Sequence, residues 1–114
     1  MNQPANVPME TDCRAVSQRL AAGGSFVLVD CREQDEFDLV RIPGARLIPM
    51  SQLAARVGEL APYRDSDLVV HCHHGGRSLR VAQWLREQGF AKAQSMAGGI
   101  DQWAVEIDRT LPRY

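Results

Sequence analysis

The chain has 114 residues, enough for one hydrophobic core and too few for two. Apolar residues make up 45% and charged residues 24%, which are values of a folded globular domain and not of a disordered chain. Thirteen Lys and Arg oppose fourteen Asp and Glu, giving a formal net charge of -1. This near-neutral balance argues against nucleic acid or an anionic membrane surface as the partner.

The cysteines are three in number, Cys13, Cys31 and Cys72. An odd set in a short chain does not form a disulfide framework, so we expect free thiols in a reducing compartment. Residues 1–12 have neither the basic start nor the apolar core of a secretory signal. The longest aliphatic runs are strand-sized and too short to span a membrane. The sequence therefore predicts a cytoplasmic protein with no membrane segment.

The order of predicted elements alternates between helices and strands. Residues 1–10 contain two prolines and little periodicity, which predicts a flexible lead-in before one domain over residues 11–114. Apolar periodicity, caps and glycines predict helices over 13–22 (capped by Thr11-Asp12), 33–39, 52–60 (capped by Ser51), 78–88 and from 100 onward. Short apolar runs predict strands over 26–29, 46–48, 68–71 and 93–96.

This alternation predicts an α/β fold. Right-handed crossovers would produce a mostly parallel sheet of about four to five strands with helices on both faces. Trp84 and Trp103 fall on helix faces and are expected to pack, and Gly98-Gly99 is expected to form a tight turn. Ligands of such sheets bind at the carboxyl ends of the strands, which directs attention to the segment after the third strand.

That segment reads His71-Cys72-His73-His74-Gly75-Gly76-Arg77-Ser78. Gly75 and Gly76 allow a tight turn in which successive backbone N–H groups face an anion, and the following helix adds the positive end of its dipole. A Cys72 thiolate would be stabilised there, and Arg77 would add a full positive charge. We therefore predict that Cys72 has a lowered pKa and acts as a nucleophile at neutral pH.

The spacing of this loop separates two classes of cysteine enzyme. Cysteine phosphatases place five residues between the cysteine and the arginine, whereas four separate Cys72 from Arg77. The shorter loop suits a single sulfur atom better than a phosphate group. At this point the chain resembles the rhodanese family in its single-domain form. The resemblance runs from about residue 10 to the end and rests on four motifs: Val29–Glu33 with Glu36-Phe37, Ile42–Ala45, Cys72–Ser78 and Gly98–Trp103.

The resemblance implies a sulfurtransferase that works through a persulfide on Cys72, with no cofactor. Cys72 would attack the outer sulfur of a donor such as thiosulfate, and cyanide or a thiol would then take that sulfur. It further implies a binding loop formed by His73, His74, Gly75, Gly76 and Arg77, supported by Asp30, Arg32 and Ser78. We expect Asp30 to hydrogen-bond the loop backbone or Arg77. Arg41 departs from the family, which usually has histidine there, and we expect this change to leave the chemistry intact.

Other functions remain open beside this interpretation. One alternative is a persulfide relay or an interaction module that serves a protein partner. Another is a small-loop cysteine phosphatase or arsenate reductase. Small-molecule sulfur donors and acceptors, or a protein that gives or takes a persulfide, are the expected partners. The expected state is a monomer or weak dimer.

The remaining histidines and cysteines have plainer interpretations. Contiguous residues such as His71–His74 cannot aim several donors at one ion, so we predict no metal site. Cys13 and Cys31 lie outside any glycine-rich loop and are interpreted as core residues. A role for Cys31 as a resolving thiol stays open.

Overall fold

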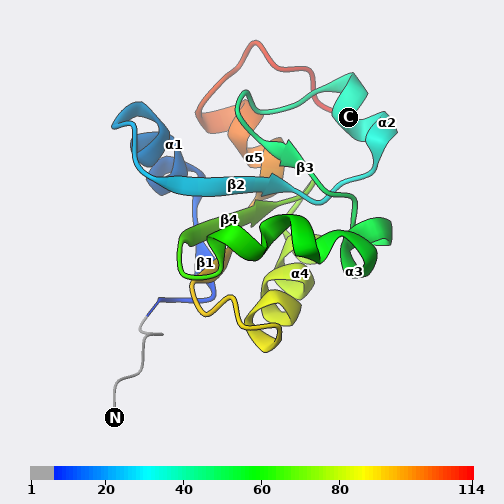
Figure 1. The fold of residues 1–114 in the computed structure, drawn as a ribbon. Helices are drawn as coiled ribbons and strands as arrows, with labels where there is room; N and C mark the ends of the chain where they lie inside the picture. Colours follow the sequence, from blue (N-terminus) through cyan, green and yellow to red (C-terminus); the bar gives the residue numbers. More distant parts are fainter. Residues whose placement is uncertain (1–6) are drawn as a thin grey trace.

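A five-stranded, all-parallel sheet forms the centre of the computed structural model, which describes residues 7–114 (Figure 1). Its strands are β1 (Glu10–Thr11), β2 (Phe26–Asp30), β3 (Arg46–Leu47), β4 (Asp67–His71) and β5 (Ala93–Met96). They lie side by side in the order β1-β5-β4-β2-β3. The α/β fold class and the parallel sheet predicted from the sequence are confirmed.

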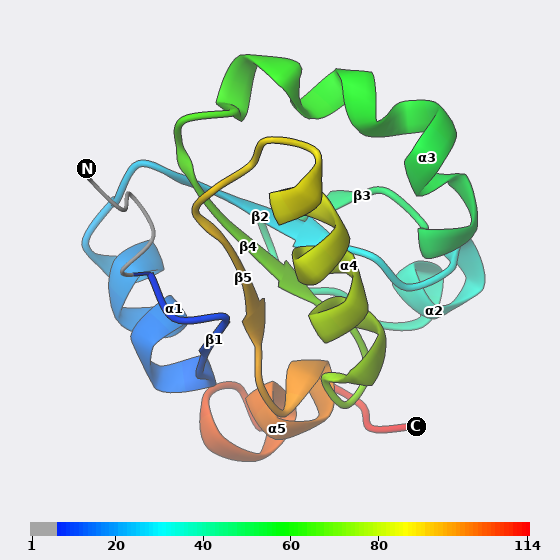
Figure 2. The same cartoon turned by 90° about the horizontal axis from the view of Figure 1, so that it is seen from below.

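Helices cover both faces of this sheet, as Figure 2 shows from below. The α-helices are α1 (Cys13–Ala21), α2 (Gln34–Leu39), α3 (Leu53–Arg56), α4 (Gly76–Glu87) and α5 (Gly99–Glu106). Two short 3-10 helices, Met50–Gln52 and Val57–Tyr63, flank α3. Helices α3 and α4 lie on one face, and α1 and α5 on the other. Within residues 7–114, no helix has the length and apolar character needed to cross a bilayer.

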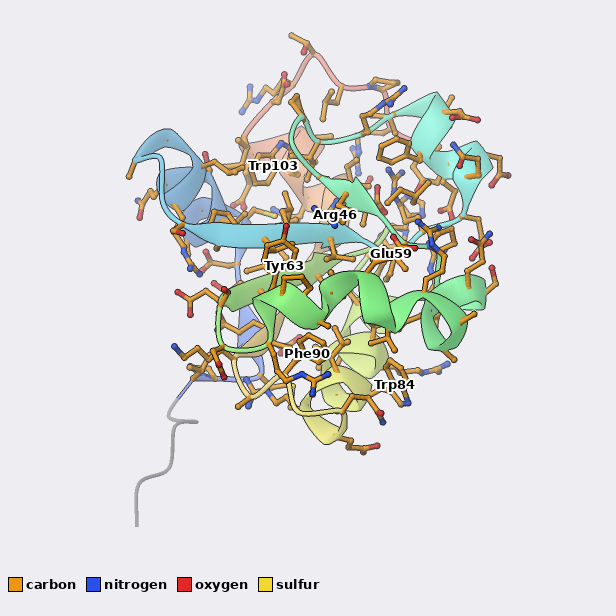
Figure 3. The ribbon with its side chains drawn as sticks, in the orientation of Figure 1. Arg46, Glu59, Tyr63, Trp84, Phe90 and Trp103 are labelled. Carbon is orange, nitrogen blue, oxygen red and sulfur yellow. The ribbon has the colours of Figure 1, made fainter. Side chains whose placement is uncertain are left out.

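Alternating side chains of the central strands build two separate cores. Val29 and Val70 face the helices α3 and α4, whereas Leu28 and Val69 face α1 and α5. Both faces are buried, which explains why these strands read as continuous apolar runs. The two tryptophans lie on opposite sides of the sheet, Trp84 beside the first core and Trp103 within the second (Figure 3).

Residues 52–60 do not form the single helix that their spacing predicts. The segment is a 3-10 turn, one turn of α-helix and a second 3-10 helix that contains Pro62. Gly58 and Pro62 both disfavour a longer α-helix. Glycine loses more backbone entropy than other residues when it becomes helical, and proline has no N–H group to donate an intrahelical hydrogen bond. Ser51 does not cap it either, since its hydroxyl donates instead to the Glu33 carboxylate over 2.7 Å.

Residues 7–10, at the end of the segment predicted as a flexible lead-in, are held against the sheet. Glu10 pairs with Ser95 in the sheet, and Arg86 donates hydrogen bonds of 2.9 Å to the carbonyls of Val7 and Pro8. The free edge of β5 supplies the backbone partners that this segment needs. The predicted flexibility of residues 1–6 lies outside the described residues.

A fully buried ion pair fixes the carboxyl end of β2. Arg32 and Asp30 both have side chains of 0% exposure, and Arg32 Nη2 lies 2.7 Å from Asp30 Oδ2. The same guanidinium donates to the carbonyls of Val40 (2.6 Å) and Glu36 (3.2 Å). It thereby satisfies carbonyls near the end of α2 and ties that helix to the strand.

Replacing Arg32 with Met should therefore strongly destabilise the fold. The Asp30 carboxylate would remain buried without its cation, which costs about 3–5 kcal/mol of unfolding free energy. Urea denaturation of the two proteins measures the difference. Arg56→Met is the matched control, because Arg56 forms an exposed pair with Glu59 and its loss should have a far smaller effect. Equal effects of the two substitutions would contradict this account.

Candidate functional site

The predicted nucleophile lies where four elements meet at the carboxyl edge of the sheet. Cys72 directly follows β4, and His71 pairs with Asp30 at the end of β2. Helix α4 begins at Gly76, and α5 begins at Gly99 against the same loop. The topology thus places the predicted loop where ligands of parallel sheets bind.

Backbone N–H groups surround the Cys72 sulfur. The N–H groups of Gly75 and Ser78 donate to Sγ over 3.1 and 3.3 Å, and the Ser78 hydroxyl lies 3.4 Å from it. Gly75 has a φ of 113°, in the left-handed region that glycine adopts without strain. This conformation turns its N–H inward and starts α4 two residues earlier than predicted. Two backbone N–H groups therefore donate to the sulfur, those of Gly75 and Ser78, whereas the sequence predicted successive donors at Gly75 and Gly76.

The pKa of Cys72 is lowered to about 4. The largest cause is a hydrogen bond from the Cys31 thiol, followed by burial, which opposes the shift, and then by the Ser78 hydroxyl and the N–H groups of Ser78 and Gly75. The same thiol contact and burial raise the pKa of Cys31. At neutral pH Cys72 is therefore a thiolate, whereas Cys31 keeps its proton. The direction agrees with the sequence prediction, but the principal donor is a residue interpreted as core.

Ser95 completes the hydrogen bonding beneath the thiolate. Its buried hydroxyl lies 2.7 Å from that of Ser78. When Ser95 donates to the Ser78 oxygen, the Ser78 proton is free to point at the Cys72 sulfur. No local motif marks Ser95, because its contact depends on the pairing of β5 beside β4.

The N-terminus of α5 holds the other side of the loop backbone. The N–H groups of Ile100 and Asp101 donate to the carbonyls of Cys72 (2.9 Å) and His73 (3.1 Å). Gly99 has a φ of 60°, and a Cβ there would lie 2.6 Å from the Cys72 carbonyl oxygen. The predicted Gly98-Gly99 turn is therefore also a close contact with the loop, which only a residue without a side chain permits.

Arg77 forms an ion pair and does not present a free charge to the loop. Its Nη1 and Nη2 atoms bind both oxygens of Glu36, over 2.7 and 2.9 Å. The pKa of Glu36 falls to about 2, mainly through this bond. The expected contact of Asp30 with Arg77 or the loop is wrong, because Arg32 on the same chain segment saturates the Asp30 carboxylate.

Tyr114 joins these ion pairs and covers the loop. Its hydroxyl donates to Glu36 over 2.7 Å and accepts from Arg32 over 2.9 Å. Its ring stacks on His73, with 3.8 Å between centroids and 3° between planes. Burial is the main cause that raises the pKa of Tyr114 to about 12, so the hydroxyl is protonated at neutral pH. Tyr114 thus contacts the loop, although the sequence alone assigns it no role.

The histidines of the motif have different surroundings. His71 is fully buried, its Nδ1 is 3.4 Å from the Cys72 carbonyl, and burial lowers its pKa. His74 is exposed and lies 3.9 Å from Asp101.

Arg41, which stands where the family usually has histidine, lies over the Phe37 ring at 4.4 Å and takes part in packing. Among residues 7–114, no three His, Cys, Asp or Glu side chains converge to hold a metal ion.

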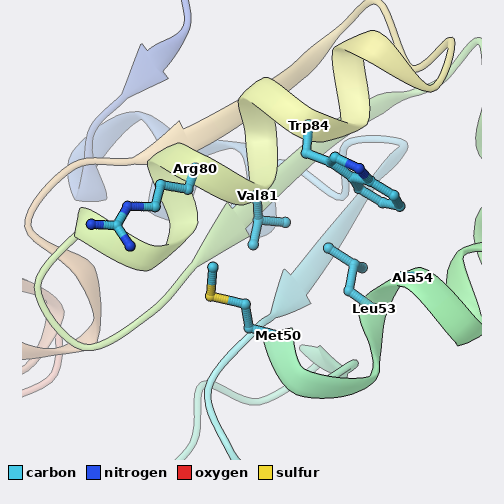
Figure 4. Close-up of a pocket in the computed structure, with 6 residues that line it drawn as sticks. All are labelled: Met50, Leu53, Ala54, Arg80, Val81 and Trp84. Atoms are coloured by element: carbon cyan, nitrogen blue, oxygen red, sulfur yellow. The ribbon is translucent and has the colours of Figure 1, made fainter.

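An apolar pocket of about 300 Å³ opens between α3 and α4 (Figure 4). Arg80 stands at the end of the pocket opposite Trp84. The backbone N–H of Met50 donates to the Cys31 carbonyl over 2.9 Å, which connects the pocket wall to the cysteine pair. Its lining residues are Met50, Leu53, Ala54, Arg80, Val81 and Trp84.

Comparison with known proteins identifies this arrangement. The family model described as Rhodanese-like domain matches residues 13–106, so the chain belongs to the rhodanese-like domain family. A sulfurtransferase of Allochromatium vinosum is 36% identical over 95 residues, covering 83% of this chain and 87% of that protein. The chloroplastic Rhodanese-like/PpiC domain-containing protein 12 of Arabidopsis thaliana is 33% identical over 89 residues, covering 76% of this chain but only 30% of that protein.

A solved structure agrees with these relatives. The human single-domain sulfurtransferase TSTD1 superimposes with a TM-score of 0.75 at 28% identity. The match covers 87% of this chain and 97% of the human chain. The family resemblance inferred from the four motifs is therefore confirmed.

Gly99→Ala should destabilise the protein by roughly 2–3 kcal/mol, because the added Cβ would overlap the loop carbonyls and φ would be strained. It should also slow alkylation of Cys72 at neutral pH, since the loop donors would move. Chemical denaturation and iodoacetamide kinetics measure both effects. Gly58→Ala is the control, because a Cβ at Gly58 meets nothing within 4 Å. A Gly99→Ala protein as stable and reactive as this control would refute the close-contact argument.

Glu36→Gln should flatten the dependence of stability on acid pH. The Glu36 pKa is about 2 in the fold against an ordinary value of 4.5, so its stabilisation is present above pH 4.5 and lost as pH falls toward 2. We expect about 1–2 kcal/mol of this loss to disappear in the variant, allowing for solvent screening at Arg77. Urea denaturation across that pH range measures it. Glu87→Gln, at an exposed residue with no ion pair in the described structure, should leave the profile unchanged.

Proposed function

We propose that this protein is a sulfurtransferase that carries sulfane sulfur as a persulfide on Cys72. The observation that carries the proposal is a Cys72 thiolate with two backbone N–H donors on a rhodanese-like fold. The chemistry needs no cofactor, because sulfur itself is both nucleophile and cargo.

The transfer has two steps. The Cys72 thiolate attacks the outer sulfur of a donor such as thiosulfate, a new S–S bond forms, and the S–S bond of the donor breaks as sulfite leaves with its electron pair. An acceptor, cyanide or a thiolate, then attacks the outer sulfur of the persulfide, and Cys72 leaves as a thiolate. A Cys72 pKa of about 4 favours both steps, because the group is ionised as a nucleophile and is stable as a leaving group.

The loop residues divide between the two sulfur atoms of the persulfide. Gly75 and Ser78 already bind the position of Sγ. We propose that the other loop residues bind the outer sulfur and the sulfur donor. Asp30 and Arg32 would support them by fixing the end of β2 beneath the loop. Those other loop residues are His73, His74, Gly76 and Arg77.

A relay between proteins is the second candidate, and the Arg77–Glu36 pair favours it. An anionic small molecule gains little from a guanidinium that a carboxylate already neutralises. A donor protein that carries a persulfide can bind through contacts of its own, and the apolar pocket beside α4 offers a surface for them.

Three free cysteines in the described structure fit a reducing compartment such as the cytoplasm. Phosphatase or arsenate reductase chemistry has no comparable support, given the four-residue spacing.

Cys72→Ser should abolish sulfur loading and leave the fold intact. After incubation with thiosulfate, the intact mass of the wild-type protein should increase by one sulfur, which cyanide removes; the variant should gain none. Cys13→Ala is the matched control, because Cys13 lies in the core on the other face of the sheet. Loading of the Cys72→Ser protein would refute the proposal. Loading of the wild-type protein from a protein persulfide alone would select the relay.

A further inference from the structure

Cys31 is a buried thiol that the sulfur-transfer steps do not use. It directly follows β2, as Cys72 directly follows β4, and the two strands end as a register pair at Asp30 and His71. The Cys31 N–H donates to the His71 carbonyl over 3.0 Å, so the parallel pairing continues to the two cysteines. Their positions are therefore neighbours across the sheet.

The distance between such neighbours suits a disulfide. Adjacent strands lie about 4.8 Å apart, and disulfides join Cα atoms about 4.4–6.8 Å apart. Both side chains enter the same core on the α3 and α4 face, with exposures of 0% for Cys31 and 1% for Cys72. The Cys31 thiol is also the largest cause of the lowered pKa of Cys72. The two sulfur atoms can therefore bond with little change of backbone.

Cys31 approaches Cys72 from the side of the neighbouring strand. The N–H donors of Gly75 and Ser78 come from the loop and the start of α4. An oxygen atom bound to Sγ on that loop side would therefore not block an attack by the Cys31 sulfur from the side of β2. Cys13 is different, since it lies in the other core and its thiol faces the carbonyls of Ala97 and Gly99. Only one of the two remaining thiols is placed to react with Cys72.

We propose that Cys31 is a resolving thiol, which converts Cys72 oxidised by a hydroperoxide into a Cys31–Cys72 disulfide. The proposal rests on the placement of the two cysteines and stands whether or not the protein transfers sulfur. It assigns a reversible modification to the pair and makes the nucleophile sensitive to peroxide.

The chemistry balances in two steps. The Cys72 thiolate attacks a peroxide oxygen, the O–O bond breaks, and the products are Cys72 sulfenic acid and hydroxide or alkoxide; sulfur is oxidised by two electrons and the peroxide is reduced. The Cys31 sulfur then attacks Cys72 Sγ, an S–S bond forms and the S–O bond breaks. The Cys31 proton leaves with the hydroxyl group as water. A dithiol reductant restores both thiols by exchange.

This reaction would protect Cys72 from irreversible damage. A sulfenic acid without a partner thiol proceeds to sulfinic and sulfonic acids, which ordinary thiols do not reduce. With Cys31 beside Cys72 at the end of the neighbouring strand, disulfide formation is intramolecular and competes with the second peroxide. Oxidation of Cys72 also removes the negative charge that raises the pKa of Cys31. Cys31 therefore loses its proton more readily, and becomes a better nucleophile, once the sulfenic acid has formed.

The test is mass spectrometry of the full chain treated with hydrogen peroxide, without any sulfur donor. The wild-type protein should lose two hydrogen atoms (~2 Da), and non-reducing peptide mapping should find Cys31 linked to Cys72, with Cys13 still open to alkylation. Dithiothreitol should restore alkylation of Cys72 in full. Addition of oxygen to Cys72 with Cys31 still alkylatable would overturn the proposal.

Variants separate the resolving role from other effects. Cys31→Ser and Cys31→Ala should accumulate two or three oxygens on Cys72 that dithiothreitol does not remove, whereas Cys13→Ser should behave as wild type. Circular dichroism checks that each variant is folded. If neither Cys31 variant folds, the peptide map of the wild-type protein still decides. A Cys31→Ser protein whose Cys72 recovers fully in dithiothreitol would refute the role.

Discussion

The structure depends on holding one negatively charged sulfur atom almost completely out of water. An isolated buried charge is costly, so the Cys72 thiolate must receive hydrogen bonds that replace its hydration. The donors are backbone N–H groups and neutral side chains, and the nearest guanidinium is occupied elsewhere. Neutral donors impose a strict geometry, because each must point at the sulfur within hydrogen-bond distance. The positions of the loop, α4, α5 and the end of β2 all follow from this requirement.

The fold satisfies that requirement by fixing the loop from both sides. Gly75 turns its N–H toward the sulfur, while the first N–H groups of α5 bind the loop carbonyls that point away from it. A peptide plane whose carbonyl is held in this way cannot rotate freely, so its neighbour's N–H keeps its direction. Beneath the loop, the buried pair of Asp30 and Arg32 fixes the end of β2 and therefore the position of Cys31. The helices of this domain therefore cover the two cores and also fix the position of the Cys72 loop.

The sequence predicts what is local and misses what the topology assembles. Four of the five strands, four of the helices and the Gly75 turn were predictable, because apolar runs and glycines act within a few residues, whereas β1 has no apolar run and forms only by pairing with β5. Glu36, Ser95 and Tyr114 were not, since their partners lie 41, 17 and 78 residues away along the chain. Asp30 shows the same limit: two basic residues, Arg32 and Arg77, were available to it, and only the fold decides which one is near. The four family motifs mark the regions that meet at Cys72, but not which atoms make contact.

If the loop transfers sulfur as proposed, the pairing of Arg77 with Glu36 bears on the kind of donor that it would accept. Thiosulfate carries two negative charges, and its binding to Arg77 would compete with a bidentate carboxylate that Tyr114 also holds. Releasing that carboxylate would leave it close to an incoming anion, which adds repulsion to the cost of breaking two hydrogen bonds. A donor with less charge than thiosulfate reduces both penalties, and a protein persulfide can additionally gain from contacts outside the loop. Cys72 is buried beneath the same loop on which Tyr114 stacks, so under the proposed function the features that stabilise the nucleophile would also select the donor.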